Sequence, residues 1–117
     1  MNFEALKYEA SISPNKRSRI IYTPGFDMVI CLHKSSVVGM HRHPKFEAYH
    51  LIEGVLLVQG IDDPLYLTIE RPMIQISPGV WHEPRAVTEF AIYREFYAGP
   101  FDKIRDVEYY KPLKVVA

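Results

Sequence analysis

Short runs of β-branched, aromatic and other apolar residues divide the sequence, and a Gly, Pro or Asp turn signal follows most of them. Such runs, four to eight residues long, are typical of strands. No window of ten or more residues shows a convincing helical stripe, although a turn or two of helix fits within residues 2–9. The pattern predicts an all-β fold, either a barrel or a double-sheet jelly roll. The expected strands are residues 19–23, 27–34, 37–43, 47–54, 55–60, 65–70, 73–77 and 86–98.

The length of the chain predicts one domain. Its 117 residues contain no internal repeat, low-complexity stretch or linker, and a single core is normal at this size. We expect residues 1–13 to form an N-terminal arm. Residues 99–117, which carry Pro100 and Pro112, are expected to form a tail that wraps over the barrel.

Charge and composition exclude several classes of protein. Lys plus Arg and Asp plus Glu each number 14, so the formal net charge is zero. A chain without a basic field is not expected to bind nucleic acid or an anionic membrane. It has no apolar run of membrane-helix or signal-peptide length. Cys31, the one cysteine, lies in an apolar run and is expected to be a buried free thiol. We therefore predict a cytoplasmic protein.

Two histidines stand one residue apart in the segment HRHPKFE. On a strand the side chains of His41 and His43 project to the same side. A bend at the proline that follows lets Glu47 turn its carboxylate back toward them. Two imidazoles and a carboxylate suit a divalent ion. The best candidate for a fourth ligand is His82, which the turn in SPGVWH delivers.

With these residues the sequence resembles the cupin superfamily. HRHPKFE, followed by six residues and Gly54, fits the first cupin motif, and SPGVWH fits the core of the second. The resemblance implies a single-domain cupin, that is, a double-stranded β-helix or jelly-roll barrel. It also implies that the metal ligands are His41, His43, Glu47 and His82.

Four segments in the same order make the sequence most similar to WbuC-type cupin metalloproteins. Those are small bacterial proteins associated with surface-polysaccharide (O-antigen) clusters. The segments are NKRSRIIYTP, HRHPKFEAYHLIEG, ISPGVWHE and YREFYAGPFD, within residues 14–105. Ser35, Met40, Ser77 and Ala86 depart from the motifs. These departures affect turns rather than ligands, and they weaken the claim about substrate.

The expected ligand set leaves the identity of the metal open. Three imidazoles and one carboxylate suit Mn, Fe, Ni, Co or Zn, with positions left for water or substrate. The lack of thiolate ligands argues against a closed structural zinc site. The alternative is a barrel of satisfied core histidines that has lost its metal. Some cupin enzymes, certain sugar ketoisomerases among them, work without metal and use histidine and tyrosine.

Two residues are candidate catalytic groups. Tyr49 shares strand parity with Glu47, so its phenol is expected beside the metal as a proton donor; the alternative is an ordinary packed aromatic. Tyr93, Glu95 and Tyr97 alternate on one face of a strand. If that face points inward, Glu95 is an acid–base group or a partner of a ligand histidine. If it points outward, the stripe is a surface face with ion pairs.

Four residues are candidates for binding a ligand. Lys16, Arg17 and Arg19 precede or begin the first strand, and arginine can hold a phosphate or carboxylate in bidentate fashion. The alternative is a solvated basic turn. Trp81, next to His82, is expected to wall the pocket, with simple packing as the alternative.

These features lead to three hypotheses about function. The first is a metal-dependent isomerase or epimerase for a sugar or sugar-nucleotide, with Tyr49 or Glu95 moving the proton. The second is an Fe(II)-dependent dioxygenase. The third is a non-catalytic module that binds a small ligand. The ligand is expected to be a small molecule, such as an anionic sugar derivative. Because small cupins often pair, we also expect a homodimer.

Overall fold

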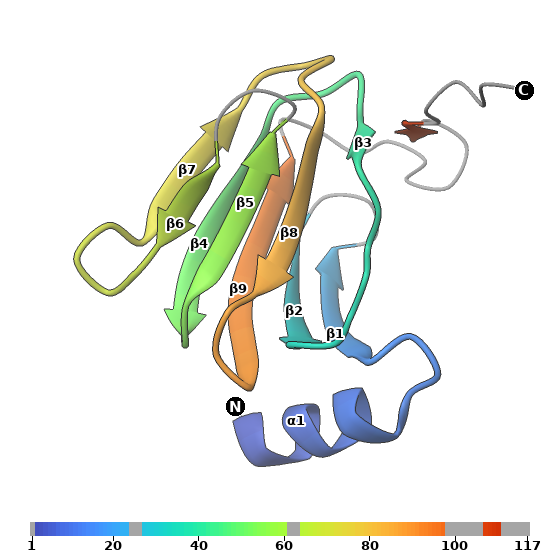
Figure 1. Ribbon diagram of the computed structural model, residues 1–117, viewed down its shortest axis with the longest axis vertical. Helices are drawn as coiled ribbons and strands as arrows, with labels where there is room; N and C mark the ends of the chain where they lie inside the picture. Colours follow the sequence, from blue (N-terminus) through green and yellow to red (C-terminus); the bar gives the residue numbers. More distant parts are fainter. Residues whose placement is uncertain (1, 24–26, 61–63, 98–106, 111–117) are drawn as a thin grey trace, which may run out of the picture.

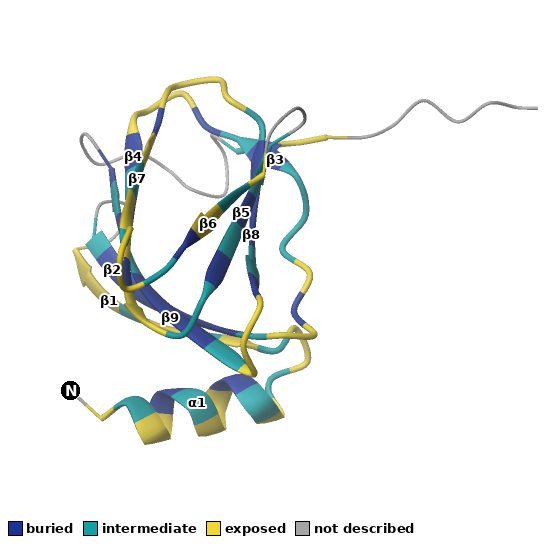
Figure 2. Cartoon of the chain, turned by 60° about the vertical axis from the view of Figure 1, so that its left-hand side comes forward, coloured by how far each residue is buried: buried dark blue, intermediate teal, exposed yellow. Residues whose placement is uncertain are grey.

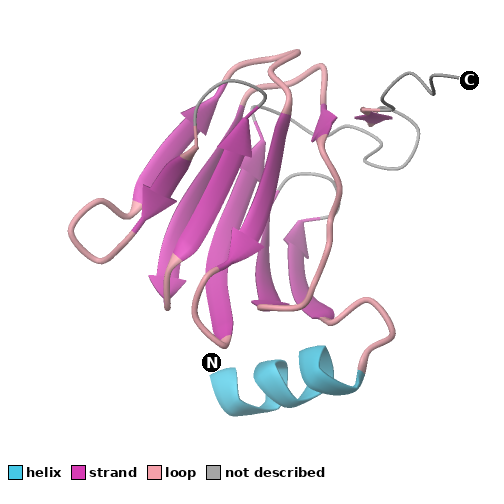
Figure 3. Ribbon diagram, viewed as in Figure 1, coloured by secondary structure: helices cyan, strands magenta, loops and turns pink. Residues whose placement is uncertain are grey.

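The computed structural model describes residues 2–23, 27–60, 64–97 and 107–110. They form two antiparallel sheets that face each other, with one helix against the outside (Figures 1 and 3). This arrangement confirms the prediction of an all-β, jelly-roll fold. The elements are α1 (Phe3–Ile12), β1 (Arg17–Thr23), β2 (Asp27–His33), β3 (His41–Arg42), β4 (Glu47–Glu53), β5 (Leu56–Gly60), β6 (Leu65–Leu67), β7 (Met73–Ile76), β8 (His82–Ala86), β9 (Phe90–Tyr97) and β10 (Glu108–Tyr109).

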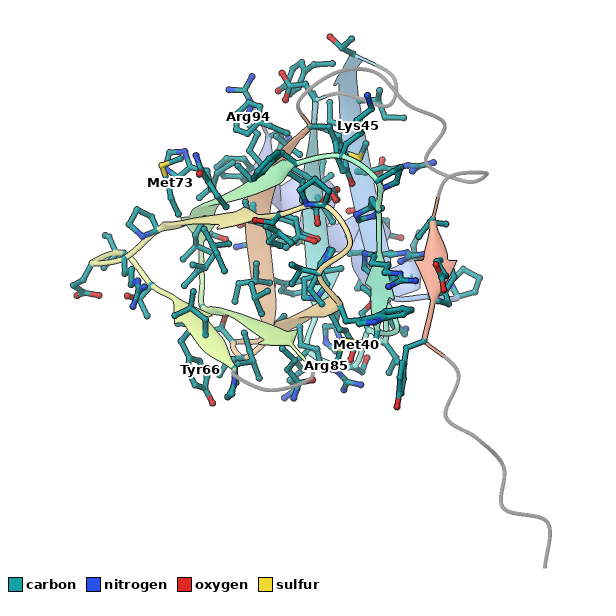
Figure 4. All side chains as sticks on the ribbon, turned by 90° about the horizontal axis from the view of Figure 1, so that it is seen from above. Met40, Lys45, Tyr66, Met73, Arg85 and Arg94 are labelled. Carbon is teal, nitrogen blue, oxygen red and sulfur yellow. The ribbon has the colours of Figure 1, made fainter. Side chains whose placement is uncertain are left out.

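The strand order places the late strands β9 and β10 next to strands from the first half of the chain. The first sheet has the order β1-β2-β9-β4-β7, and the second sheet has the order β10-β3-β8-β5-β6. Most neighbours in each sheet are therefore distant in sequence. Side chains fill the space between the sheets, whereas Arg94 on the first sheet and Tyr66 on the second lie on the outside (Figure 4).

Strand β2 explains why residues 27–34 read as one apolar run. Met28, Ile30 and Leu32 belong to the main core between the sheets. Val29 and Cys31 point the other way and are buried as well, in a second apolar cluster. A strand covered on both faces needs apolar residues at every position.

Helix α1 forms the cover of that second cluster. Asn2 caps it, because its side-chain oxygen accepts a hydrogen bond of 3.1 Å from the Ala5 N–H. Leu6 and Ala10 are its buried residues, and they pack against Val29, Cys31 and Ile92. Figure 2 shows α1 beside the sheet, with its buried residues in dark blue. The helix runs three residues beyond the expected turn or two. Its apolar stripe is too narrow to be recognised in the sequence, and the sheet beneath it supplies the missing stabilisation.

The prediction of one long strand over residues 86–98 is wrong. The chain forms β8 in the second sheet, turns at residues 87–89, and continues as β9 in the first sheet. Thr88 holds this turn: its hydroxyl donates to the Phe90 carbonyl at 2.7 Å and accepts from the Val55 N–H at 3.0 Å. Residue alternation continues through such a corner, so the pattern alone does not reveal the break.

Gly54 makes the neighbouring turn possible. Its φ is +84°, and a Cβ at this position would lie 2.4 Å from the Phe90 carbonyl oxygen and 2.6 Å from the Thr88 hydroxyl. Any side chain would therefore clash with backbone as well as require a left-handed conformation. The turn between β4 and β5 thus packs directly on the turn between β8 and β9.

The structure describes only a small part of the expected C-terminal tail. Within 99–117, residues 107–110 are described, and β10 in this segment pairs with β3; the rest of the tail lies outside the described residues. The expected N-terminal arm is largely helix α1. No described helix has the length and apolar character required to cross a membrane.

Candidate metal centre

Three histidines from two distant stretches of sequence meet between the sheets. His41 on β3 and His82 on β8 are directly opposite each other in the second sheet, and His43 follows two residues after His41. Their candidate ligand nitrogens all lie within 4.8 Å of one another, and all three side chains are buried. The predicted convergence of these histidines is therefore present, and such a cluster can bind a divalent metal.

Backbone carbonyls orient two of the three rings. His41 Nδ1 lies 2.8 Å from the Gly39 carbonyl, and His82 Nδ1 lies 2.8 Å from the Val80 carbonyl. A carbonyl can only accept, so each Nδ1 carries the proton and each Nε2 keeps its lone pair. This is the tautomer that a metal-binding histidine requires. The buried Glu83 supports the arrangement by accepting a 2.7 Å hydrogen bond from the Gly39 N–H.

The turn of the second motif is attached to the first motif. The Gly79 N–H donates to the His43 carbonyl at 2.9 Å. Gly79 has a φ of +78°, which glycine adopts without strain. The turn that precedes His82 is thus fixed to the segment that carries His41 and His43.

Glu47, the first residue of β4, lies against this cluster of three histidines but is not part of the group whose ligand atoms all lie within 4.8 Å of one another. Its side chain is buried, its Oε1 contacts His82 Nε2, and it lies 3.5 Å from His43 Nδ1. Burial raises the pKa of Glu47 to about 7; the contact with His82 opposes this rise, and the nearby charge of Glu95 adds to it. For His82, burial alone would lower the pKa, but the contact with Glu47 raises it overall. In the metal-free protein the two groups therefore compete for a proton.

A metal ion fits the chemistry of this donor set. Three buried imidazoles that lie close together, with the carboxylate of Glu47 against His82, match the ligands that first-row divalent metals prefer. The same groups without a metal leave a carboxylate away from water, which is costly. The residues present are thus suited to Mn, Fe, Ni, Co or Zn.

The polar stripe of β9 lies on the inner face of the first sheet. Tyr93, Glu95 and Tyr97 are all buried there. The Tyr97 hydroxyl donates to Glu95 Oε1, and Glu95 is directly opposite Tyr49 on β4. Of the two alternatives in the sequence, the structure therefore shows the inward stripe, with Glu95 close enough to influence Glu47.

Tyr49 stands beside the histidines with a free hydroxyl. Its side chain is fully buried, and the hydroxyl has no hydrogen-bond partner among the described residues. Its ring centroid lies 6.1 Å from that of His82 and 4.9 Å from that of Tyr93. Burial, reinforced by the charges of Glu47 and Glu95, holds the pKa of Tyr49 well above its usual value. The phenol is therefore neutral and able to donate.

These groups line a cavity of about 510 Å³, a normal size for a small-molecule site. The buried His41, His43, Tyr49 and Glu95 form its floor, and the exposed Arg17 and Arg19 lie at its rim. The floor, so defined, takes residues from both sheets, whereas the rim belongs to β1 at the edge of the first sheet. One cavity thus contains two of the four candidate ligands, both candidate acid–base groups and two of the three basic residues, whereas Glu47 and His82 are not among its described lining residues.

Two predicted ligand-binding residues lie elsewhere. The Lys16 ammonium donates to the Ser11 carbonyl at 2.6 Å, and Lys16 is not among the described residues that line the cavity. Trp81 is also outside that lining. Its ring stacks on the Arg42 guanidinium, 4.4 Å from Cζ, and meets the ring of Tyr110. Because adjacent residues of an extended chain project to opposite sides, Trp81 faces away from the direction that His82 takes.

A wall of the cavity is formed by residues that the sequence did not single out. Tyr109 on β10 lines the cavity, and its ring centroid lies 5.8 Å from that of His41. Strand β10 is held on β3 by backbone pairing and by Arg42, which forms a 2.9 Å ion pair with Glu108. This wall comes from a pairing between remote segments, for which no local pattern gives a signal.

Comparisons with known proteins identify the fold. No model of a known protein family and no curated protein matches the sequence. Among solved structures, a cupin-like protein from Thermotoga maritima is similar with a TM-score of 0.63 at 13% identity, over 80% of this chain and 74% of that one. KdgF from Halomonas sp. is similar with a TM-score of 0.60 at 15% identity, over 80% of this chain and 88% of that one.

A third similar structure belongs to a larger protein. The DMSP lyase DddQ from Ruegeria pomeroyi matches with a TM-score of 0.56 at 18% identity. The match covers 62% of this chain and 37% of the lyase, so this chain spans little more than a third of that protein. At these identities the similarity concerns the fold alone. The chain therefore has the cupin fold, and its three buried histidines form a site that can bind a metal ion.

Proposed function

We propose that this chain is a metal-dependent enzyme that moves a proton next to a carbonyl group of a sugar or sugar-nucleotide, as an isomerase or epimerase does. One observation carries the proposal. The cavity that reaches His41 and His43 also contains a free tyrosine hydroxyl and a buried carboxyl, those of Tyr49 and Glu95. Proton transfer needs such a pair beside a site that stabilises negative charge on oxygen.

In this proposal His41, His43, Glu47 and His82 hold the metal. When bound, a divalent ion supplies Lewis-acid stabilisation of an oxygen that becomes negative during the reaction. The carbonyls of Gly39 and Val80 keep the His41 and His82 rings in the ligating tautomer. The cupin fold and the buried histidines support this assignment.

The proton would pass through Glu95 and Tyr49, which are direct neighbours across β9 and β4. Glu95 would take a proton from the carbon beside the carbonyl, and the Tyr49 phenol would return one at the adjacent position. Transfer from Glu95 to Tyr49 then restores both groups. The Tyr97 hydroxyl, which donates to Glu95, would hold the carboxylate in place between these steps.

The biological setting is part of the same proposal. The resemblance to WbuC-type cupins supports a role in surface-polysaccharide metabolism, in the cytoplasm, with the protein acting as a homodimer. Size-exclusion chromatography with light scattering tests the dimer. A monomer at micromolar concentration would overturn that part alone.

Metal analysis tests the foundation of the proposal. We expect purified protein to contain about one transition-metal ion per chain, as in other single-site metal centres, and the His43→Ala variant to contain almost none. His50→Ala is the matched control, because His50 is exposed on β4. An unchanged metal ratio in His43→Ala would refute the ligand assignment.

A solvent-exchange experiment tests the chemistry. Incubation with candidate sugar nucleotides in D₂O should introduce deuterium at the carbon beside the carbonyl, detected by NMR. Tyr49→Phe and Glu95→Gln should each slow this exchange at least about 100-fold while they leave the metal ratio unchanged. Equal exchange in all proteins would exclude these two residues as the proton carriers.

An Fe(II)-dependent dioxygenase is the second candidate, because the set of three histidines and one carboxylate also serves iron. Oxygen uptake that requires Fe(II) and an electron-rich substrate would favour it. The buried tyrosine and glutamate on the cavity favour the isomerase instead. Tight binding of a sugar nucleotide with neither exchange nor oxygen uptake would indicate a non-catalytic module.

A further inference from the structure

We infer that Arg17 and Arg19 form an anion-binding subsite at the rim of the cavity, which binds a phosphate or carboxylate group of the ligand while the rest of the ligand reaches the histidines. This inference rests on the proposed function and names its substrate class, a sugar derivative with an anionic group remote from the reacting carbon.

The first argument is the direction of the two side chains. Arg17 and Arg19 are two residues apart on β1, so they share a face of the strand. Their direct partners on β2 are Leu32 and Ile30, respectively, and both partners belong to the core between the sheets. Opposed residues of paired strands project to the same face. The arginines therefore project from the inner face of the first sheet, and their exposed side chains lie at the edge of the cavity.

The second argument is the lack of a carboxylate partner. Within the described part of the chain, Arg42, Arg85 and Arg94 each pair with a carboxylate. Arg17 and Arg19, like Arg71 in the turn before β7, form no ion pair there, but only Arg17 and Arg19 line the cavity. Two uncompensated guanidinium groups on one cavity create a positive potential that attracts anions.

The third argument is the character of the cavity between rim and floor. Ser13, Asn15 and Ser18 line it near the arginines and carry no charge. Glu95 is the one acid among the described lining residues, and its carboxylate already accepts a hydrogen bond from Tyr97. An anionic group at the rim therefore meets two cations and polar neighbours without an opposing charge beside them.

Tyr93 connects the rim with the floor. It is buried, lines the cavity, and is opposite Ile30, the residue that pairs with Arg19. Burial raises the pKa of Tyr93 well above its usual value, and Arg17 lies close enough to oppose that rise in part. A ligand that spans the cavity thus finds guanidinium donors first, a neutral phenol next, and the candidate metal site at the bottom.

The difference between the basic rim and the floor with the candidate metal ligands predicts the orientation of the substrate in the cavity. Its anionic group stays at the exposed rim, where guanidinium groups can bind it in bidentate fashion, and its carbonyl end points to the histidines. The arginines would then position the reacting carbon relative to Tyr49 and Glu95. Lys16 has no part in this subsite, because its ammonium is bonded to the Ser11 carbonyl.

Calorimetric titration tests the subsite with three probes: glucose 6-phosphate, gluconate and neutral glucose. We expect the Arg17→Gln/Arg19→Gln double variant to bind the anionic probe at least about tenfold more weakly than the wild type, because it loses charge-assisted hydrogen bonds. Binding of glucose should not change. Preference for the phosphate or for the carboxylate identifies the anionic group. Equal affinity of the double variant and the wild type for both anions would overturn the inference.

Two controls separate this inference from general charge effects and from the proposed function. Lys16→Gln removes one charge from the adjacent position and should bind the anions like the wild type; a loss equal to that of the double variant would mean non-specific attraction. His43→Ala should still bind inorganic phosphate at the rim. If His43→Ala binds phosphate and keeps its metal ratio, the metal proposal fails and the anion subsite stands. If His43→Ala loses both the metal and phosphate binding, the anion subsite is refuted.

Discussion

The two faces of the first sheet differ in character although the same strands form both. On the outer face Val29, Cys31 and Ile92 pack against helix α1 in an apolar cluster. On the inner face the alternate residues of β9 include Tyr93 and Glu95, which are buried beside the candidate metal site. One face is built to stabilise the sheet, and the other carries groups whose burial costs free energy.

Titration behaviour shows the same contrast. On the outer face burial raises the pKa of the Cys31 thiol to about 11, so the thiol stays neutral and packs like a small apolar residue. On the inner face Glu47 has its pKa raised into the neutral range and competes with His82 for a proton. Burial of a neutral group is compatible with stability, whereas the inner face depends on a metal or a proton to balance its charges.

The largest change in the free energy of unfolding is expected for a substitution on the outer face. Ile92→Ala should lower the free energy of unfolding by about 2–5 kcal/mol, because it removes a fully buried side chain between helix and sheet. Urea denaturation measures this loss. Ile21→Ala, at a position that is 46% exposed on β1, should cost much less. The metal ratio of folded Ile92→Ala should equal that of the wild type; a lower ratio would mean that the two faces are not independent.

A pH-dependent effect is expected on the inner face of the metal-free protein. The pKa of Glu47 is about 7 in the folded state, above its ordinary value of 4.5. The folded state therefore holds a proton that the unfolded chain has released, and stability should fall as the pH rises from about 4.5 to about 7. The raised pKa of His82 has the same sign: its contribution is present below pH 6.5 and is lost as the pH rises through the folded value.

Urea unfolding at several pH values between 5 and 8 measures this dependence. Glu47→Gln should flatten it, because the substitution removes the titrating carboxyl and the contact that raises the pKa of His82. Saturating metal should flatten it as well, since binding of the metal favours the ionised carboxylate. A steep pH dependence that persists in Glu47→Gln would contradict this interpretation.

Substitution of Tyr49 is expected to change stability by a smaller amount than Ile92→Ala and to increase it rather than decrease it. Its buried hydroxyl has no hydrogen-bond partner among the described residues, and such a group costs about 1–3 kcal/mol. Tyr49→Phe should therefore raise the thermal stability of the metal-free protein, as measured by calorimetry, while it impairs proton transfer. A clear loss of stability would show that the hydroxyl is satisfied in solution.

The smallest change in stability is expected for a substitution at the exposed edge of the outer face. Arg94 forms a two-pronged ion pair with Asp27, with distances of 2.9 and 2.7 Å, but its side chain is 42% exposed. Exposed pairs of this kind contribute about 0–1 kcal/mol. Arg94→Gln should therefore shift the denaturation midpoint only slightly at low salt and not at all at high salt. A loss as large as that of Ile92→Ala would place Arg94 in the stabilising cluster.

The sequence by itself determined the strand character, the pairing of residues on each face, and the candidate ligands. Period-two alternation is a local property of an extended chain, so it shows that His41 goes with His43 and Tyr93 with Glu95. The segment HRHPKFE also indicated Glu47, the separate segment SPGVWH indicated His82, and the resemblance of both to the cupin motifs implied the ligand set.

Only the tertiary structure decided which of these faces meet. The division of residues 86–98 into two strands, the cover of helix α1 and the cavity wall at Tyr109 depend on contacts between segments far apart in the sequence. The same holds for Arg17 and Arg19, whose inward direction follows from the pairing of β1 with β2. Local pattern sets the side to which a residue points relative to its neighbours, but long-range pairing sets what lies on that side.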